Sequence, residues 1–354
     1  MECMKFLAAV VLLSAPLFAQ LNIESLFGPE TPTGPYKHPS SIEALDNGDL
    51  ILVYYGGEGE YAGGTALFMS RRRAGETKWS APVQIARDPF YALGNGVIWQ
   101  APDRTVWLFN VVRFGDFWST SRIAARISHD RGVTWSDPSL LRLDEGWMVR
   151  GKPILLSSGK YLLPIYHETG TDREVVPVGT TSLFLIYDPS TKKWTPSGRI
   201  RSRLGNLQPS PVEMSPGHLL AFCRRGGGYG GQKDGWLVRA ESDDGGMTWT
   251  EGHDSEFPNP NSAVELLRLR SGKLLLIYND SFSDRTPLTA ALSSDGGRTW
   301  PVKRNLAAGN DSFAYPSAVQ TPDGRIHLVF TRDSRRVVSY VSFTESEIVS
   351  PSGR

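Results

Sequence analysis

The sequence is poor in cysteine and in net charge. Its 354 residues include only two cysteines, Cys3 and Cys223, and the formal net charge is +1. So small a net charge gives no overall attraction to nucleic acid or to an anionic membrane surface, and neither is expected as a partner. Cys223 lies in the apolar stretch 219–223, where we expect a buried small hydrophobe rather than a nucleophile. If Cys3 leaves with the N-terminal segment, no intrachain disulfide can form.

Helical and metal-binding patterns are also missing. No window repeats apolar residues at the spacing of a helical face over several turns, whereas alternation with a period of two is frequent. The 36 glycines and 24 prolines agree with many short strands joined by tight turns. None of the six histidines stands in a cluster with metal-ligand spacing, so neither a metal nor another cofactor is expected.

The N-terminal residues predict export. Lys5 is followed by the apolar run 6–18, and Ala19 offers a small residue for cleavage before Gln20. The run is too short to span a bilayer, which takes about 20 apolar residues. We therefore expect residues 1–19 to be a signal peptide and residues 20–354 to form a single domain. The mature protein would be periplasmic or extracellular, without membrane insertion.

Two sequence patterns repeat along the chain. The turn S-x-D-x-G-x-T-W occurs at residues 128–135, 242–249 and 293–300. Its Gly allows a positive φ, its Asp and Thr can bond to local backbone groups, and its Trp can cover the sheet below. A tight turn followed by an apolar strand occurs six times, with strands at 50–55, 106–111, 161–166, 219–223, 274–278 and 326–330. Strand-rich repeats of this length predict an all-β fold, namely a six-bladed β-propeller.

The sixth unit, residues 315–343, lacks the turn motif and an outer strand. We expect residues 21–27 to complete it, which closes the ring and removes exposed sheet edges. A β-sandwich or two separate β domains would be the alternative, but the regular repeat without a linker-like break favours one ring.

Polar side chains should gather on the face of the ring opposite the S-x-D-x-G-x-T-W turns. Basic, amide, carboxylate and aromatic residues from all six units fall there, and such a surface suits a small polar anion, most simply an acidic sugar. The glycine-rich run 226–231 lacks the strand, loop and helix context of a phosphate loop, so we expect a flexible flap over this site.

With these turns the chain resembles the sialidase superfamily, specifically the sialidase-like (neuraminidase-like) branch with Asp-box, or BNR, repeats. The resemblance covers residues 35–343 and rests on the repeated turns, which are specific for the fold and nearly silent on activity. It implies a secreted exo-glycoside hydrolase of the sialidase type. Its substrate would be a terminal acidic sugar on an oligosaccharide or glycan.

The resemblance also implies site residues, position by position. Lys37 stands where the first of three carboxylate-binding arginines is expected, and Arg224 and Arg285 fit the second and third. Tyr315, followed by Pro316 and Ser317, matches the catalytic tyrosine. Three further residues on the same face are expected to bind substrate: Arg113, Arg150 and His167.

Two positions depart from the family pattern. Gln208 stands where a glutamate should activate the tyrosine, and the loop that should hold an acid/base aspartate has Glu58 and Glu60 instead. A tyrosine with a pKa of about 10 is a poor nucleophile unless a base takes its proton, and Gln208 is no base. Lys37 can pair with a carboxylate only as a point charge, not as a planar fork.

Three interpretations follow from these residues. The first is the exo-glycoside hydrolase, with Tyr315 at the anomeric centre and Glu60 or Glu58 as the acid. The second is a polysaccharide lyase or rhamnosidase-like enzyme at uronate linkages, in which His38, His167 or Tyr315 handles the proton. The third is a glycan-binding propeller without catalytic activity.

Overall fold

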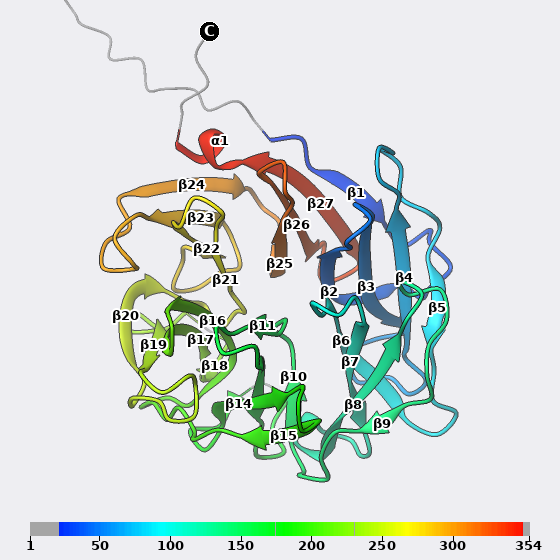
Figure 1. The fold of residues 1–354 in the computed structure, drawn as a ribbon, viewed down its shortest axis with the longest axis horizontal. Helices are drawn as coiled ribbons and strands as arrows, with labels where there is room; N and C mark the ends of the chain where they lie inside the picture. The colour runs from blue at the N-terminus through cyan, green and yellow to red at the C-terminus, as the bar shows by residue number, and fades with distance from the viewer. Residues whose placement is uncertain (1–20, 174, 230, 350–354) are drawn as a thin grey trace, which may run out of the picture.

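The computed structural model describes residues 21–349 except 174 and 230. Six antiparallel sheets stand around a common axis (Figure 1), which confirms the predicted six-bladed β-propeller. The signal peptide expected at residues 1–19 lies outside the described residues. Within residues 21–349, apart from those two gaps, no helix is long and apolar enough to cross a membrane.

Each blade runs from an inner strand beside the axis to an outer strand at the rim. A 3₁₀ turn, η1 (Trp118–Thr120), and a short helix, α1 (Glu345–Val349), lie outside the sheets. From the inside outward, the first blade consists of β2 (Tyr36–Ala44), β3 (Leu50–Gly57), β4 (Ala66–Arg72) and β5 (Val83–Ala86), and the second of β6 (Ala92–Gln100), β7 (Val106–Arg113), β8 (Ser121–Ser128) and β9 (Ser139–Leu140). The third consists of β10 (Trp147–Val149) with β11 (Ile154–Leu155), β12 (Tyr161–His167), β14 (Thr181–Asp188) and β15 (Lys193–Pro196), and the fourth of β16 (Asn206–Ser215), β17 (His218–Arg225), β19 (Trp236–Ser242) and β20 (His253–Pro258). The fifth consists of β21 (Glu265–Arg268), β22 (Leu274–Asn279), β23 (Leu288–Ser293) and β24 (Val302–Ala307), and the sixth of β25 (Ala314–Gln320), β26 (Arg325–Arg332), β27 (Val337–Thr344) and β1 (Glu24–Phe27).

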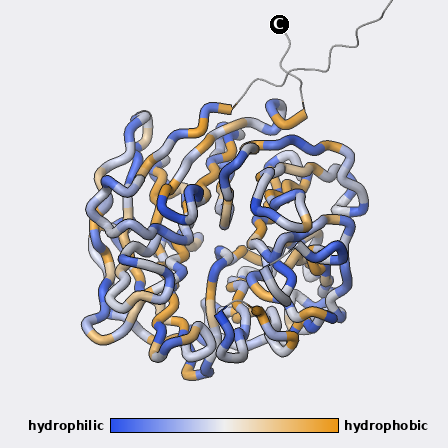
Figure 2. Tube along the Cα trace, turned by 180° about the vertical axis from the view of Figure 1, so that it is seen from behind, coloured by the Kyte–Doolittle hydropathy of each residue, from blue (hydrophilic) through white to orange (hydrophobic). Residues whose placement is uncertain are grey.

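Each blade packs against a neighbouring blade on both faces of its sheet, which explains why its central strands are continuously apolar in sequence. All six residues of β22 are buried, whereas only one residue of the outer strand β20 is buried. Figure 2 shows apolar stretches along strands inside the ring and hydrophilic stretches in many of the loops around it. Cys223, in β17, is 0% exposed, as expected, and burial raises the pKa of its thiol to about 12. It is therefore a packing residue.

Each of the three S-x-D-x-G-x-T-W turns forms the same pattern of hydrogen bonds. In the third, Asp295 accepts bonds from the backbone N–H groups of Arg298 and Thr299, and Ser293 Oγ accepts one from Gly297 at 2.8 Å. Gly297 has a φ of +80°, and a Cβ atom there would lie 2.8 Å from a methyl group of Leu220 in the preceding blade. The motif therefore both closes its own hairpin and packs against its neighbour.

The first described strand closes the ring. β1 pairs with β27 in antiparallel register, Glu24 opposite Tyr340, so the sixth sheet contains both the first and the last described strand (Figure 1). Phe27 is buried there and stacks on Tyr54 of the first blade, with 5.7 Å between ring centroids. The expected pairing of residues 21–27 with the sixth unit is confirmed for Glu24–Phe27.

Several inner segments have an irregular turn near the start. Asn95, Gln208, Asn261 and Tyr315 all have positive φ values between 42° and 57°, and three of them fall at breaks in strand register. A bulge of this kind bends a strand and redirects a side chain, and backbone strain of this kind is concentrated at functional sites. Here it brings side chains of separate blades into one network.

Candidate functional site

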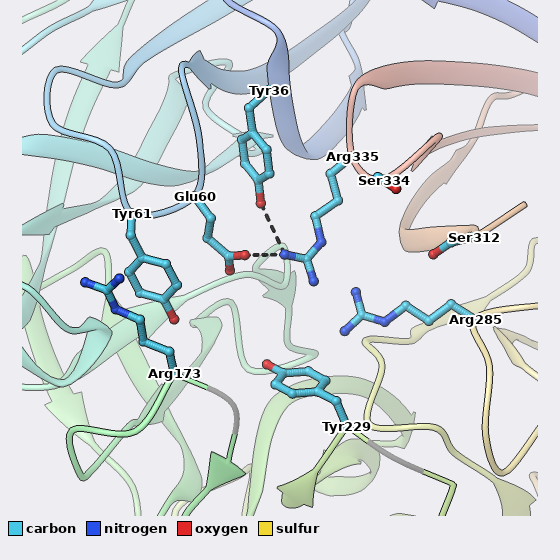
Figure 3. A pocket seen from close by; sticks show the side chains of 9 residues that line it. All are labelled: Tyr36, Glu60, Tyr61, Arg173, Tyr229, Arg285, Ser312, Ser334 and Arg335. Carbon is cyan, nitrogen blue, oxygen red and sulfur yellow. Dashed lines mark hydrogen bonds and ion pairs between the residues drawn. The ribbon is translucent and has the colours of Figure 1, made fainter.

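A pocket of about 470 Å³ opens on the face away from the S-x-D-x-G-x-T-W turns. Those turns join third and fourth strands, whereas the pocket loops mainly join second and third strands, which end on the opposite face in an antiparallel sheet. Nine residues line it (Figure 3): Tyr36, Glu60, Tyr61, Arg173, Tyr229, Arg285, Ser312, Ser334 and Arg335. A smaller cavity of about 30 Å³ lies beside it, shares Glu60 and Tyr229, and reaches Tyr315.

Arg224 is the centre of the hydrogen-bond network. It is 1% exposed, and its Nη1 donates to the Tyr315 hydroxyl at 2.8 Å and to Gln208 Oε1 at 3.1 Å. Its Nε donates to Asn261 at 2.6 Å and its Nη2 to the Tyr229 hydroxyl at 3.0 Å. Four partners from different loops and strands hold the guanidinium in one orientation.

Two further arginines complete a cationic cluster around Tyr315. Arg285 lies 5.6 Å from the centroid of the Tyr315 ring, and Arg335 forms an ion pair with Glu60. Figure 3 shows both guanidinium groups pointing into the pocket. Burial and the charges of Arg335 and Arg224 lower the pKa of Arg285 to about 10. A cation that is disfavoured in this way is stabilised when an anion binds beside it.

The cluster makes the Tyr315 hydroxyl unusually acidic. Burial alone would raise its pKa, but the charges of Arg224, Arg285 and Arg335 outweigh burial, and the pKa lies below its ordinary value. Gln208 Nε2 donates toward the hydroxyl at 3.4 Å and toward that of Tyr166 at the same distance. The phenolate is thus stabilised by cations and amide donors, without a carboxylate base.

His38 lies beside Tyr315, as expected of a site residue. The two ring centroids are 4.1 Å apart with an edge-on arrangement. His38 Nδ1 bonds to Thr331 Oγ1 at 2.8 Å, and its buried Nε2 has no hydrogen-bond partner among the described residues. Burial, together with the surrounding arginines, holds the pKa of His38 well below its usual range, so the ring is neutral.

The structure does not bring Lys37 to the pocket. Its side chain is buried elsewhere, with Nζ donating to the carbonyl oxygen of Gly34 at 2.6 Å. The reason is local: a residue on the regular part of β2 alternates in direction with His38, which faces Tyr315. Arg335, from the loop between β26 and β27, supplies the third cation instead.

Two other expected residues support the site without lining either cavity described here. Arg150 is buried, pairs with Glu265 at 3.2 Å, and lies 5.6 Å from the Tyr315 ring centroid. Arg113 donates to the carbonyl oxygens of Tyr61 and Ala62, so it holds the loop that carries Glu60.

His167 and Glu58 lie outside the two cavities. His167 Nδ1 is 2.9 Å from Arg199 Nη1, shortly after β15, and Glu58 is exposed in its loop. Successive residues of an extended segment point to opposite faces of the sheet, so Tyr166 and Glu168 reach the small cavity from one face and His167 points to the other.

The sequence placed Glu168 on the polar face but gave it no role, and it did not indicate Arg335 at all. Strand parity would have selected Glu168 over His167, because Tyr166 is a buried residue of the same strand. Glu168 lines the small cavity with Tyr315. Burial raises its pKa to about 7, with the Arg224 charge opposing the shift and the Glu60 charge adding to it. The sequence signal that could have identified Arg335 as a site residue is weaker: it lies in a polar loop that follows the second strand of the sixth unit.

The glycine-rich segment lies over the cavities, where a flap was expected. A short ladder pairs β13 (Val175–Val176) with β18 (Gly227–Gly228), which ties this segment to the loop after β12. Tyr229 extends from it and accepts a bond from Arg224. The flexibility of the segment stays a prediction.

The residues that the structure describes include no cluster of side chains suited to ligating a metal. No group of three or more His, Cys, Asp or Glu side chains there could hold a metal ion. The side chains that line the two cavities carry guanidinium, amide, phenol, imidazole and carboxyl groups.

Comparisons with known proteins agree on the fold. A family model described as a BNR repeat-like domain matches residues 48–328. The chain is 25% identical over 221 residues to a sialidase of Micromonospora viridifaciens, covering 57% of this chain and 32% of the relative. It thus spans about a third of the length of that curated relative.

Two solved structures illustrate the similarity. The NanB sialidase from Streptococcus pneumoniae superposes with a TM-score of 0.76 at 13% identity, covering 96% of this chain and 72% of that one. A protein of unknown function from Dyadobacter fermentans gives a TM-score of 0.75 at 18% identity, covering 93% and 99%. At such identities the similarity concerns the fold alone.

Proposed function

The chain belongs to the BNR repeat-like domain family and has a sialidase-like fold, and from that premise we propose that it is a glycoside hydrolase of the sialidase type. Its substrate is a terminal acidic sugar on an oligosaccharide or glycan. On the strength of the predicted signal peptide, we place its action outside the cytoplasm.

One observation carries the proposal: Arg224 donates to the Tyr315 hydroxyl at 2.8 Å, and Arg285 and Arg335 lie close enough for their charges to act on the same group. Adjacent cations repel one another, so the site favours an anionic ligand. A carboxylate suits it because guanidinium groups bind carboxylates in a planar, two-point geometry. Arg224 already has four hydrogen-bond partners, so Arg285 and Arg335 are the residues better placed to receive the ligand.

The same cations prepare Tyr315 for chemistry. In the mechanism that we propose, the ionised Tyr315 oxygen attacks the anomeric carbon while the bond from that carbon to the leaving-group oxygen breaks. Water then attacks the anomeric carbon and displaces Tyr315, which regenerates the phenolate. Arg224 and Gln208 hold the phenol oxygen throughout by donating to it. A tyrosine nucleophile is a known exception to hydrolysis by two carboxylates.

Release of free acidic sugar tests the function directly. The purified chain should liberate sialic acid from sialyl-lactose and an aryl alcohol from a fluorogenic aryl sialoside. Tyr315→Phe and Arg285→Ala should each lower kcat/KM by at least about 100-fold, since each removes a group that acts on the reacting atoms or the carboxylate. Arg201→Ala, which changes an exposed arginine, is the matched control and should keep the wild-type rate.

Other outcomes would point to the two alternative functions. Growth of unsaturated-uronate absorbance on uronate oligosaccharides would identify a lyase, and saturable binding to acidic glycans without turnover would identify a binding protein. Wild-type rates in both Tyr315→Phe and Arg285→Ala would remove these residues from the site.

A further inference from the structure

Two carboxyl groups line the small cavity that contains Tyr315. They belong to Glu60, in the loop between β3 and β4, and to Glu168, directly after β12. A hydrolase that cleaves a glycosidic bond needs a group that protonates the leaving oxygen. When two titratable groups share a site but differ in surroundings, the difference assigns their roles.

Glu60 is engaged with a cation. Its carboxylate forms an ion pair with Arg335, whose Nη1 also lies 3.4 Å from the Tyr36 hydroxyl (Figure 3). Protonation of Glu60 would break this pair and release the arginine that we assign to the substrate carboxylate. Glu60 is therefore suited to holding Arg335 rather than to donating a proton.

Glu168 has the opposite surroundings. It forms no ion pair with any described residue, and its side chain is half-buried in a cavity lined mainly by phenol, apolar and amide groups, with Arg224, Glu60 and His38 also in the lining. The groups that act on its charge are Arg224 and Glu60, with the former opposing and the latter reinforcing the effect of burial. Burial without a partner favours the neutral acid, which carries a proton at near-neutral pH.

The backbone fixes Glu168 at this position. Its N–H donates to the carbonyl oxygen of Gly146 at 2.8 Å. Gly146 has a φ of +74°, and a Cβ atom at that residue would lie 2.3 Å from the Glu168 carbonyl oxygen. A glycine is thus required where the neighbouring loop passes Glu168. The Glu168 side chain lines the same small cavity as that of Tyr166.

We propose that Glu168 is the proton donor of the hydrolase, a catalytic residue, and that Glu60 is a positioning residue for Arg335. The assignment rests on the function proposed above. As the bond between the anomeric carbon and the leaving oxygen breaks, its electron pair takes the Glu168 proton and the leaving group departs as an alcohol. The Glu168 carboxylate then accepts a proton from the attacking water, whose oxygen bonds to the anomeric carbon as Tyr315 departs.

Dependence on the leaving group tests this role. An aryl alcohol leaves without protonation, whereas the sugar hydroxyl of sialyl-lactose does not. Glu168→Gln should therefore lower kcat/KM on sialyl-lactose by roughly 100- to 10,000-fold, and on a fluorogenic aryl sialoside by less than about tenfold. Glu60→Gln should lower both by a similar factor, mainly through KM. Glu251→Gln, an exposed glutamate after the second repeated turn, is the control.

A second measurement does not depend on activity. Difference infrared spectra between wild type and Glu168→Gln should contain the carbonyl band of a protonated carboxyl group, and equal thermal midpoints would show that the variant folds. Equal losses on the two substrates, or no loss on either, would overturn the donor role while leaving the hydrolase proposal standing. A wild-type protein that releases nothing from either substrate would overturn both.

Discussion

At the scale of single residues, positive charges rather than a neighbouring base favour ionisation of Tyr315. Gln208 occupies a position beside Tyr315 but cannot take its proton, and its amide donates to the hydroxyl instead. The charges of Arg224, Arg285 and Arg335 lower the pKa of Tyr315 despite its burial. In the mechanism that we propose, ionisation of Tyr315 is thus linked to the same charges that bind the anionic substrate.

Tyr315 should therefore ionise below the ordinary range of a phenol. Its pKa lies below that value in the folded protein, so the phenolate forms as pH rises toward it. Arg285→Ala removes a positive charge and should shift the titration to higher pH. The measurement is phenolate absorbance against pH, with the matching Tyr315→Phe protein subtracted in each case. A Tyr315 that titrates at or above the ordinary phenol value, or an unchanged titration in Arg285→Ala, would contradict this view.

At the scale of elements, the repeated turns and the bulges have separate tasks. The turns pack one blade on the next at one face, and the bulged inner segments aim side chains at the other. The turns could be predicted because each needs Gly, Asp, Thr and Trp at fixed spacing. The bulges could not, because Gln208 and Tyr315 carry no local signal for a positive φ.

Substitution of a turn glycine should cost stability without changing the pocket. Gly297→Ala forces a positive φ on alanine and brings its Cβ against Leu220, so we expect a loss of about 2–4 kcal/mol in unfolding free energy. Gly324→Ala is the control, because Gly324 has a similar φ of +86° but no atom near its Cβ. Urea unfolding should rank Gly297→Ala as the less stable, and equal midpoints would show that inter-blade packing contributes nothing here.

The candidate site was only partly predictable for a related reason. Arg224, Arg285, Gln208 and Tyr315 lie together as the resemblance implied, and His38, expected from its place on the same face, lies beside Tyr315. Lys37 does not, because its side chain leaves β2 on the side away from Tyr315. Arg335 comes from a loop whose three consecutive positive φ values, at residues 333–335, are invisible in composition or period.

At the scale of the whole molecule, ring closure depends on one short strand. β1 supplies the outer edge of the sixth blade, and without it β27 would present unpaired backbone groups to solvent. The closure was predictable, because a six-unit repeat with an incomplete last unit needs a strand from elsewhere.

Phe27 should anchor this closure. It is 6% exposed and stacks on Tyr54, so Phe27→Ala should lower the unfolding free energy by about 3–5 kcal/mol. Leu143→Ala, at a residue 79% exposed, should change it by less than about 0.5 kcal/mol. Denaturant unfolding would measure both, and a Phe27→Ala value near that of Leu143→Ala would mean that β1 is dispensable.

The pairing of β1 with β27 also bears on how the protein folds. Glu24 lies opposite Tyr340, so the contact joins two segments that are far apart in the sequence. Five of the blade sheets are built from contiguous stretches of the chain, whereas the sixth combines β25, β26 and β27 with the distant strand β1. Loops of such length close slowly, and refolding of the intact chain should therefore be limited by the final docking of these two segments.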